Sequence, residues 1–236
     1  MLANKVVLIT GGSKGIGYGI AESLLKEGAR VAITSRSIER AQEAEAALSI
    51  LYPDKVISIE SDVRNLGSQK AAVASVIKRW GKLDVLIANA GVGHFHSIEE
   101  LSSEQWNETI DVNLTGVFNS VKASIPPLKI SKGYIITIAS LAGTNFFAKG
   151  SAYNASKFGL VGFSQAIMLD LRYEGIKVTT IMPGSVSSHF NNRIPSESDA
   201  WKIQPEDLGQ IVVDLLKMNP RTLPSKIEVR PSIPSK

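Results

Sequence analysis

Residues 6–17 of the 236-residue chain read VVLITGGSKGIG, an apolar run followed by a glycine-rich turn. The β-branched first half is typical of a buried strand, and helical periodicity begins at Ile16. Glycines let a strand turn sharply into a helix and let a ligand approach the backbone closely. The first N–H groups of such a helix favour an anion, which is how phosphate groups are commonly held. A glycine-rich turn also occurs for purely structural reasons, so this stretch alone leaves both uses open.

The alternation of strand and helix continues along the chain. Apolar, β-branched runs occur at residues 6–10, 30–34, 55–59, 85–88, 134–139, 178–182 and 227–229. Helical periodicity lies between them, at residues 16–26, 38–51, 68–80, 103–124, 152–173 and 205–217. Strict alternation with strands apolar on both faces is typical of a parallel sheet covered by helices. We therefore expect an α/β fold, a single doubly wound Rossmann domain over residues 1–236, with a seven-stranded parallel sheet and helices on both faces.

Composition excludes several classes of protein. A hydrophobic fraction of 44% and a charged fraction of 20% are ordinary for a globular chain. The net charge of +4 comes from scattered Lys and Arg, so we expect no nucleic-acid partner. There is no cysteine, which excludes disulfides and thiolate metal sites, and we expect no metal. The apolar run near Met1 is too short for a signal peptide, and no stretch is long enough to span a membrane, so we expect a soluble, cytoplasmic protein without a membrane partner.

The spacing of the glycines in the turn, Gly11, Gly15 and Gly17, resembles that of the short-chain dehydrogenase/reductase family. The resemblance implies that the turn holds the phosphates of a nicotinamide dinucleotide. Its predicted contacts are Gly11, Ser13, Lys14, Gly15, Ile16 and Gly17.

The end of the second strand predicts which nicotinamide cofactor binds. Ser35 and Arg36 stand where an NAD enzyme places an acidic side chain against the ribose 2'-hydroxyl. The guanidinium of Arg36 suits a 2'-phosphate instead, and Lys14 supplies a second cation. We therefore expect NADP (NADPH) as the cofactor. The other interpretation of Arg36 is an ordinary surface charge beside a helix.

Further cofactor contacts follow from the resemblance. They are Asp62 and Val63 beside the adenine, Asn89, Ala90 and Gly91 along the cleft, and Pro183, Gly184, Val186 and Ser188 after the sixth strand. Asp62 would serve equally well as the amino-terminal cap of a turn, and that role stays open. Ser188 departs mildly from the family's usual Thr, and it keeps the hydroxyl.

Ser140, Tyr153 and Lys157 form the predicted catalytic group. Tyr153 and Lys157 are four residues apart on a predicted helix and so share one face. A lysine cation stabilises phenolate and lowers the pKa of the phenol from about 10, which makes it usable as an acid and a base. Ser140 would donate a hydrogen bond where negative charge develops on the substrate oxygen. An isolated Tyr-x3-Lys pair is usually a surface pair, but here Ser140 and Asn113 stand with it in the family's order. By the resemblance, Asn113 holds a water that relays protons to Lys157, while Tyr153 and Lys157 also contact the cofactor.

Residues 185–204 follow the sixth strand without helical periodicity, at the place of the family's lid, so we expect a short substrate lid. His94, Phe146, Phe147 and Phe190 are the predicted substrate contacts, although simple core packing would explain the aromatic residues equally well. If they form a wall, the pocket favours bulky apolar aldehydes, ketones or diketones.

The sequence therefore predicts an NADP(H)-dependent oxidoreductase that moves a hydride between nicotinamide and a small-molecule carbonyl or secondary alcohol. Two alternatives remain, a 3-oxoacyl-[acyl-carrier-protein] reductase and a non-catalytic NADP-binding sensor. The chain's end lacks the Gly-Gly of many family members, which counts against a typical ketoacyl reductase. By family analogy we also expect a homodimer or homotetramer, built through the helices at 103–124 and 152–173.

Overall fold

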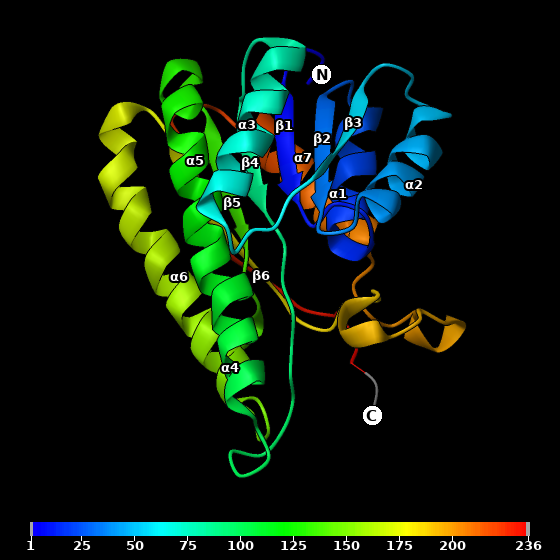
Figure 1. The fold of residues 1–236 in the computed structure, drawn as a ribbon, viewed down its shortest axis with the longest axis vertical. Helices are drawn as coiled ribbons and strands as arrows, with labels where there is room; N and C mark the ends of the chain where they lie inside the picture. Colours follow the sequence, from blue (N-terminus) through cyan, green and yellow to red (C-terminus); the bar gives the residue numbers. More distant parts are fainter. Residues whose placement is uncertain (1, 235–236) are drawn as a thin grey trace.

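Seven parallel strands form one sheet in the order β3-β2-β1-β4-β5-β6-β7 (Figure 1). The computed structural model describes residues 2–234. The strands are β1 (Val6–Thr10), β2 (Arg30–Ser35), β3 (Val56–Glu60), β4 (Val85–Ala88), β5 (Tyr134–Ile138), β6 (Lys177–Pro183) and β7 (Lys226–Val229). The chain runs outward from β1 to β3, returns to β4 on the other side of β1, and continues to β7. The strand order therefore reverses between β1 and β4, which is where open α/β sheets bind ligands.

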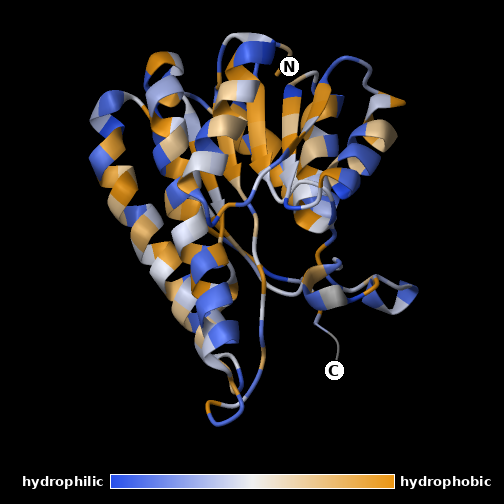
Figure 2. Ribbon diagram, viewed as in Figure 1, coloured by the Kyte–Doolittle hydropathy of each residue, from blue (hydrophilic) through white to orange (hydrophobic). Residues whose placement is uncertain are grey.

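Helices cover both faces of the sheet, as the sequence predicted. They are α1 (Gly15–Lys26), α2 (Ile38–Ser49), α3 (Leu66–Trp80), α4 (Ser103–Ile110), α5 (Gly116–Ser131), α6 (Ser151–Leu171) and α7 (Pro205–Lys217). α1, α2 and α7 share one hydrophobic core, and α3, α5 and α6 share the other. Alternate residues of β1 supply the two cores, since Val7 and Ile9 pack on the first side while Val6 and Leu8 pack on the second. Hydrophobic residues accordingly fill the strands in Figure 2, while the helices carry polar residues outward. None of the helices within residues 2–234 is long and apolar enough to cross a membrane.

The helix predicted over residues 103–124 differs from the observed one in two ways. A five-residue π-helix, Asp111–Thr115, separates α4 from α5. In addition, α5 continues through Pro126 and Pro127 to Ser131. The prolines remove two amide donors, but Leu128 keeps the apolar spacing of the buried face and lies fully in the core. Tertiary packing thus outweighs the local helix-breaking signal.

The predicted lid at residues 185–204 carries more structure than its sequence indicated. It contains two short 3-10 turns, η4 (Phe190–Asn192) and η5 (Glu197–Asp199). A parallel bridge between Val186 and Ile203 joins its ends, with the Ser187 amide donating to the Ile203 carbonyl at 2.9 Å. Figure 1 shows the segment beyond the carboxyl ends of the strands, on the side of α1.

Candidate active site

The turn between β1 and α1 needs glycine at two positions. Gly11 and Gly15 have φ of +64° and +57°, a region that side chains with a Cβ rarely adopt. Asn89, at the end of β4, braces the turn by donating from Nδ2 to the carbonyls of Thr10 and Gly11 at 3.0 and 2.9 Å. α1 then begins at Gly15 with no side-chain cap and no acid in its first turn, whereas α2 is capped by Ser37. The start of α1 is thus shaped to receive an anion.

A cavity of about 1190 Å³ runs past this turn. Most of the predicted cofactor residues line it: Gly11, Ser13, Lys14, Gly15, Ile16, Ser35, Arg36, Val63, Asn89, Ala90, Gly91, Tyr153, Lys157, Pro183, Gly184, Val186 and Ser188. Its size, its glycine cradle and the uncapped helix end fit a nicotinamide dinucleotide.

Two predicted cofactor residues do not line the cavity. Gly17 lies behind the turn, where a Cβ would come within 2.5 Å of the Gly11 carbonyl oxygen, so its role is close packing. The carboxylate of Asp62 is paired with the Arg64 guanidinium at 2.6 Å, and it also accepts from the Arg64 amide at 2.9 Å. This pair holds the pKa of the Asp62 carboxyl below its usual value. Asp62 therefore caps a local turn, and its contact with the adenine stays a prediction.

One end of the cavity is basic. Lys14 and Arg36 both line it and are exposed, and Ser35 rather than an acid ends β2. Arg40 also lines the cavity, from the first turn of α2. The sequence analysis missed Arg40, because Arg36 precedes the N-cap Ser37 and no helical spacing joins the two residues.

Tyr153 and Lys157 project from α6 toward the cavity, and Ser140 lies beside them at the end of β5. The Lys157 ammonium lies 5.6 Å from the centre of the Tyr153 ring and donates to the Ile138 carbonyl at 3.1 Å. The Ser140 hydroxyl donates to the Pro183 carbonyl at 3.4 Å. Three separate elements thus bring the predicted group together.

Burial perturbs both titratable groups of this pair. It raises the pKa of Tyr153 to about 12, against the opposing effect of the Ser140 hydroxyl. Burial also lowers the pKa of Lys157 to about 8. The expected lowering of the Tyr153 pKa is therefore not found in the protein alone, because desolvation of the phenol outweighs the hydrogen bond with the Ser140 hydroxyl.

Asn113 lies in the π-helix, fully buried, and its amide is occupied by protein groups. Oδ1 accepts from the Val92 amide at 2.8 Å, while Nδ2 donates to the Val92 carbonyl at 2.9 Å and to Ser156 Oγ at 3.0 Å. Its side chain therefore ties the segment after β4 to α6. The water relay assigned to Asn113 stays a prediction.

Aromatic side chains surround the Tyr153 ring. The Phe95 and Phe190 rings lie 5.4 and 5.7 Å from it between centres, and Phe147 lies 5.9 Å from Phe95. Phe95, at the centre of this group, is not among the predicted substrate contacts. Phe146 is 87% exposed and does not line the cavity, so its predicted substrate contact is not found. An adjacent pair on one loop places its two side chains differently, which the sequence pattern did not resolve.

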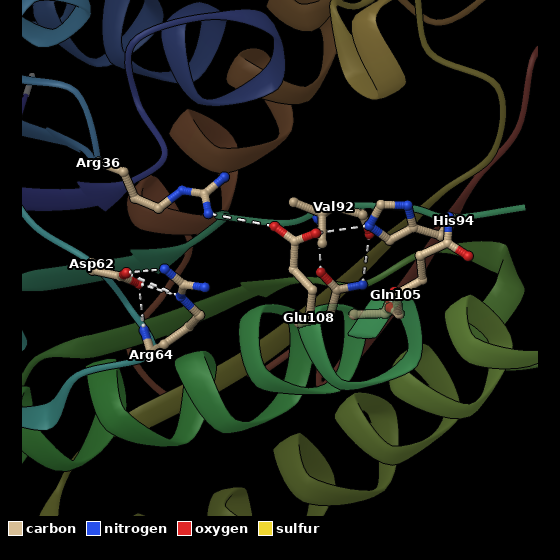
Figure 3. A network of polar contacts seen from close by, with 9 residues as sticks. Arg36, Asp62, Arg64, Val92, His94, Gln105 and Glu108 are labelled. Atoms are coloured by element: carbon tan, nitrogen blue, oxygen red, sulfur yellow. Dashed lines mark hydrogen bonds and ion pairs between the residues drawn. The ribbon is translucent and has the colours of Figure 1, made fainter. Parts of the chain in front are cut away.

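His94 lines the cavity but is already engaged by a carboxylate. Its Nε2 lies 2.8 Å from Glu108 Oε2 on α4, and Glu108 Oε1 lies 3.5 Å from Arg36 Nη1 (Figure 3). The sequence analysis missed Glu108, because Arg36 is 72 residues away and no local pattern joins them.

Comparison with known proteins places this fold and site in a family. A model of the short chain dehydrogenase family matches residues 5–199, so the chain belongs to the short-chain dehydrogenases. Trans-4-hydroxycyclohexanecarboxylate dehydrogenase from Sinomonas cyclohexanicum is 36% identical over 88% of this chain and 85% of its own. 3-Dehydrosphinganine reductase TSC10B from Arabidopsis thaliana is 40% identical over 75% of this chain, and glycine betaine reductase ATRR from Emericella nidulans is 30% identical over 98% of it. The chain spans only 54% and 19% of the lengths of these last two relatives.

Solved structures agree with the family assignment. An alcohol dehydrogenase from the archaeon Thermococcus sibiricus, complexed with 5-hydroxy-NADP, is 28% identical with a TM-score of 0.91, over 98% of this chain and 99% of that one. A 3-ketoacyl-(acyl-carrier-protein) reductase from Brucella melitensis, complexed with NADH, is 25% identical with a TM-score of 0.89 over the same shares. The fold is therefore the Rossmann-like α/β fold of this family.

Proposed function

We propose that this short-chain dehydrogenase is an NADP(H)-dependent oxidoreductase acting on a carbonyl or secondary alcohol, with Tyr153 as its acid and base. The observation that carries the proposal is the meeting of Ser140, Tyr153 and Lys157 in one cavity with the uncapped start of α1. The bound nicotinamide would supply or accept the hydride. Tyr153 would give a proton to the substrate oxygen in reduction and take it back in oxidation.

The two partners of Tyr153 have separate tasks in this proposal. With a pKa of about 8, Lys157 is mainly a cation at neutral pH, so its charge favours the phenolate form of Tyr153. The positive ring of the oxidised cofactor would add to that effect. Ser140 would donate a hydrogen bond to the substrate oxygen, where negative charge develops. We also propose, by family analogy, that the segment around Asn113 takes part in returning protons to Lys157.

The preference for NADP(H) is supported by the basic end of the cavity. Lys14, Arg36 and Arg40 line it, and β2 ends on Ser35 with no acid to hold a ribose 2'-hydroxyl. The archaeal relative's complex with 5-hydroxy-NADP agrees with this choice, while the Brucella enzyme is complexed with NADH. One charge-assisted phosphate contact contributes about 1.5 to 3 kcal/mol, so we expect at least about a tenfold preference for NADPH.

The aromatic group around Tyr153 supports an apolar substrate. Phe95 and Phe190 pack against the Tyr153 ring, Phe147 packs against Phe95, and large apolar rings favour substrates with apolar surface to bury. We propose bulky apolar aldehydes, ketones or diketones as the substrate class.

A substrate panel tests the proposal. The purified protein is given NADPH or NADH with apolar aldehydes, ketones and diketones, a charged keto acid, and a 3-oxoacyl thioester. We expect turnover of the apolar carbonyls, faster with NADPH, and a loss of about 10²-fold or more in Tyr153→Phe with unchanged NADPH affinity. A thioester preference would favour the acyl-carrier-protein reductase, and cofactor binding without any turnover would favour the sensor.

A further inference from the structure

Glu108 contacts Arg36, the residue that the proposed function assigns to the 2'-phosphate. The two side chains come from elements 72 residues apart, Arg36 from the end of β2 and Glu108 from the last turn of α4, and both line the cofactor cavity. Figure 3 shows the guanidinium and the carboxylate reaching toward each other from their separate elements. Nη1 of Arg36 and Oε1 of Glu108 are 3.5 Å apart.

Two neighbours hold the Glu108 carboxylate in this position. His94 binds the other oxygen, Oε2, at 2.8 Å, which leaves Oε1 directed at Arg36. The hydrogen bond from His94, together with the charges of His94 and Arg36, keeps the pKa of Glu108 below its usual value. Glu108 is therefore an anion at neutral pH.

Among the nearby charged side chains, Glu108 is the acid that forms an ion pair with Arg36. Asp62 is paired with Arg64 through both of its oxygens. Lys14 and Arg40 line the same cavity and add positive charge at this end. A phosphate bound at Arg36 would thus meet several cations and the Glu108 carboxylate, whereas the charge of Asp62 is offset by Arg64.

We propose that Glu108 is a specificity-determining residue that weakens discrimination between NADP(H) and NAD(H) by competing with the 2'-phosphate for Arg36. This proposal rests on the proposed function, since it takes Arg36 as the phosphate contact. A 2'-phosphate carries nearly two negative charges, so placing it on Arg36 brings it close to the Glu108 carboxylate, and the two anions compete for one guanidinium. A cofactor with a 2'-hydroxyl adds no charge there and leaves the pair intact. Arg36 selects for the phosphate, and Glu108 reduces the selectivity that Arg36 alone would give.

Dissociation constants for NADP⁺ and NAD⁺, measured by calorimetry at low ionic strength, test this proposal. Glu108→Gln keeps the size and a hydrogen-bonding group but removes the charge. We expect it to tighten NADP⁺ binding by about tenfold and to change NAD⁺ binding by less than about twofold. Glu104→Gln is the matched control, because it removes the same charge from an exposed site one turn earlier on α4. We expect the control to change both affinities only slightly and equally.

Arg36→Met separates this proposal from the proposed function. If Arg36 binds the 2'-phosphate, Arg36→Met weakens NADP⁺ alone, and adding Glu108→Gln to it no longer restores tight NADP⁺ binding. A second outcome is that Arg36→Met weakens NADP⁺ binding, while Glu108→Gln either leaves NADP⁺ binding unchanged or weakens the binding of both cofactors. That outcome would overturn the proposed competition by Glu108 and leave the assignment of Arg36 to the 2'-phosphate intact. If Arg36→Met leaves NADP⁺ unaffected, the phosphate assignment itself fails.

Discussion

Lys157 occupies a position that is unfavourable for its own charge. Its ammonium is buried beside Tyr153 with one carbonyl partner, Ile138, and burial lowers its pKa from 10.5 to about 8. A shift of this size corresponds to about 3 kcal/mol of lost stability while the group stays charged. Retaining such a lysine fits the catalytic role that we propose for it, in which the cation favours phenolate at Tyr153.

Replacing Lys157 by Met is expected to stabilise the protein at neutral pH. The buried charge disappears, while the hydrogen bond to Ile138 contributes only about 1 kcal/mol, so we expect a gain of about 1–2 kcal/mol in the free energy of unfolding near pH 7. Between pH 8 and 10.5 the folded wild type releases the lysine proton while the unfolded chain still binds it, so wild-type stability rises with pH. The advantage of the variant therefore shrinks over that window.

Urea unfolding at about pH 7 and about pH 9.5 measures this effect. Lys70→Met, at an exposed position on α3, is the control and should show no such pH-dependent difference. A variant that is less stable than wild type at both pH values would contradict the assigned cost of burial.

Phe147 and Phe146 offer a matched test of whether the aromatic side chains around Tyr153 contact the substrate. Phe147 lines the cavity and packs on Phe95, whereas Phe146 is 87% exposed and lies outside the cavity. We expect Phe147→Ala to lower kcat/KM for bulky apolar ketones by about tenfold relative to small aldehydes, since roughly half of a Phe burial contribution is lost. NADPH affinity should stay the same. Steady-state kinetics on the substrate panel measure this, and Phe146→Ala should leave the order of substrates by kcat/KM unchanged. The same order in the wild type and in both variants would show that Phe147 does not contact the substrate.

At the scale of single residues, the sequence predicted correctly those placements that follow from local spacing along the chain. Tyr153 and Lys157 share a face because they are four residues apart, and Arg36 follows a recognisable strand end. The pairing of Arg36 with Glu108 depends on how two distant elements pack, and the raised pKa of Tyr153 depends on burial by Phe95 and other neighbours. Neither property is encoded in a local pattern.

Among the elements, the π-helix between α4 and α5 has the most direct link to the site. Its wider turn places Val112 against the cavity and buries Asn113 beneath the segment that follows β4. π-helical turns of this kind are frequent at functional sites. The sequence predicted one continuous helix over residues 103–124, because helical periodicity continues on both sides of the π-helix and helix propensity does not distinguish an α-helical turn from a π-helical one.

Asn113→Ala is expected to loosen the segment after β4. The change removes three hydrogen bonds and leaves the Val92 amide and carbonyl without their partner, which we expect to cost about 2–4 kcal/mol. Urea unfolding measures the loss, and hydrogen exchange should show faster exchange at the Val92 amide than elsewhere in the core. Asn107→Ala, at an exposed position on α4, is the control. Unchanged protection of Val92 would show that Asn113 does not anchor this segment.

The whole molecule leaves large apolar side chains exposed on α4, α5 and α6. Trp106, Phe118, Phe158 and Leu169 are 39%, 44%, 43% and 52% exposed. The Phe118 ring packs edge-on against Phe163 at 6.4 Å, so α5 and α6 present a joined apolar surface. Hydrophobic residues recur along both helices in Figure 2. Contiguous apolar patches of this kind commonly mark protein interfaces.

We predict that this surface joins copies of the chain in a homodimer or homotetramer, with α5 and α6 packing on their counterparts across a two-fold axis. Light scattering at micromolar concentration should give two or four times the chain mass of 25.4 kDa. A charge buried in such an interface without a partner costs several kcal/mol, so Phe158→Glu should shift the protein toward monomer. Ile50→Glu, at an 80% exposed position after α2, introduces the same charge away from this surface and should leave the mass unchanged. A wild-type monomer would refute the assembly, and an unchanged mass in Phe158→Glu would place the interface elsewhere on the molecule.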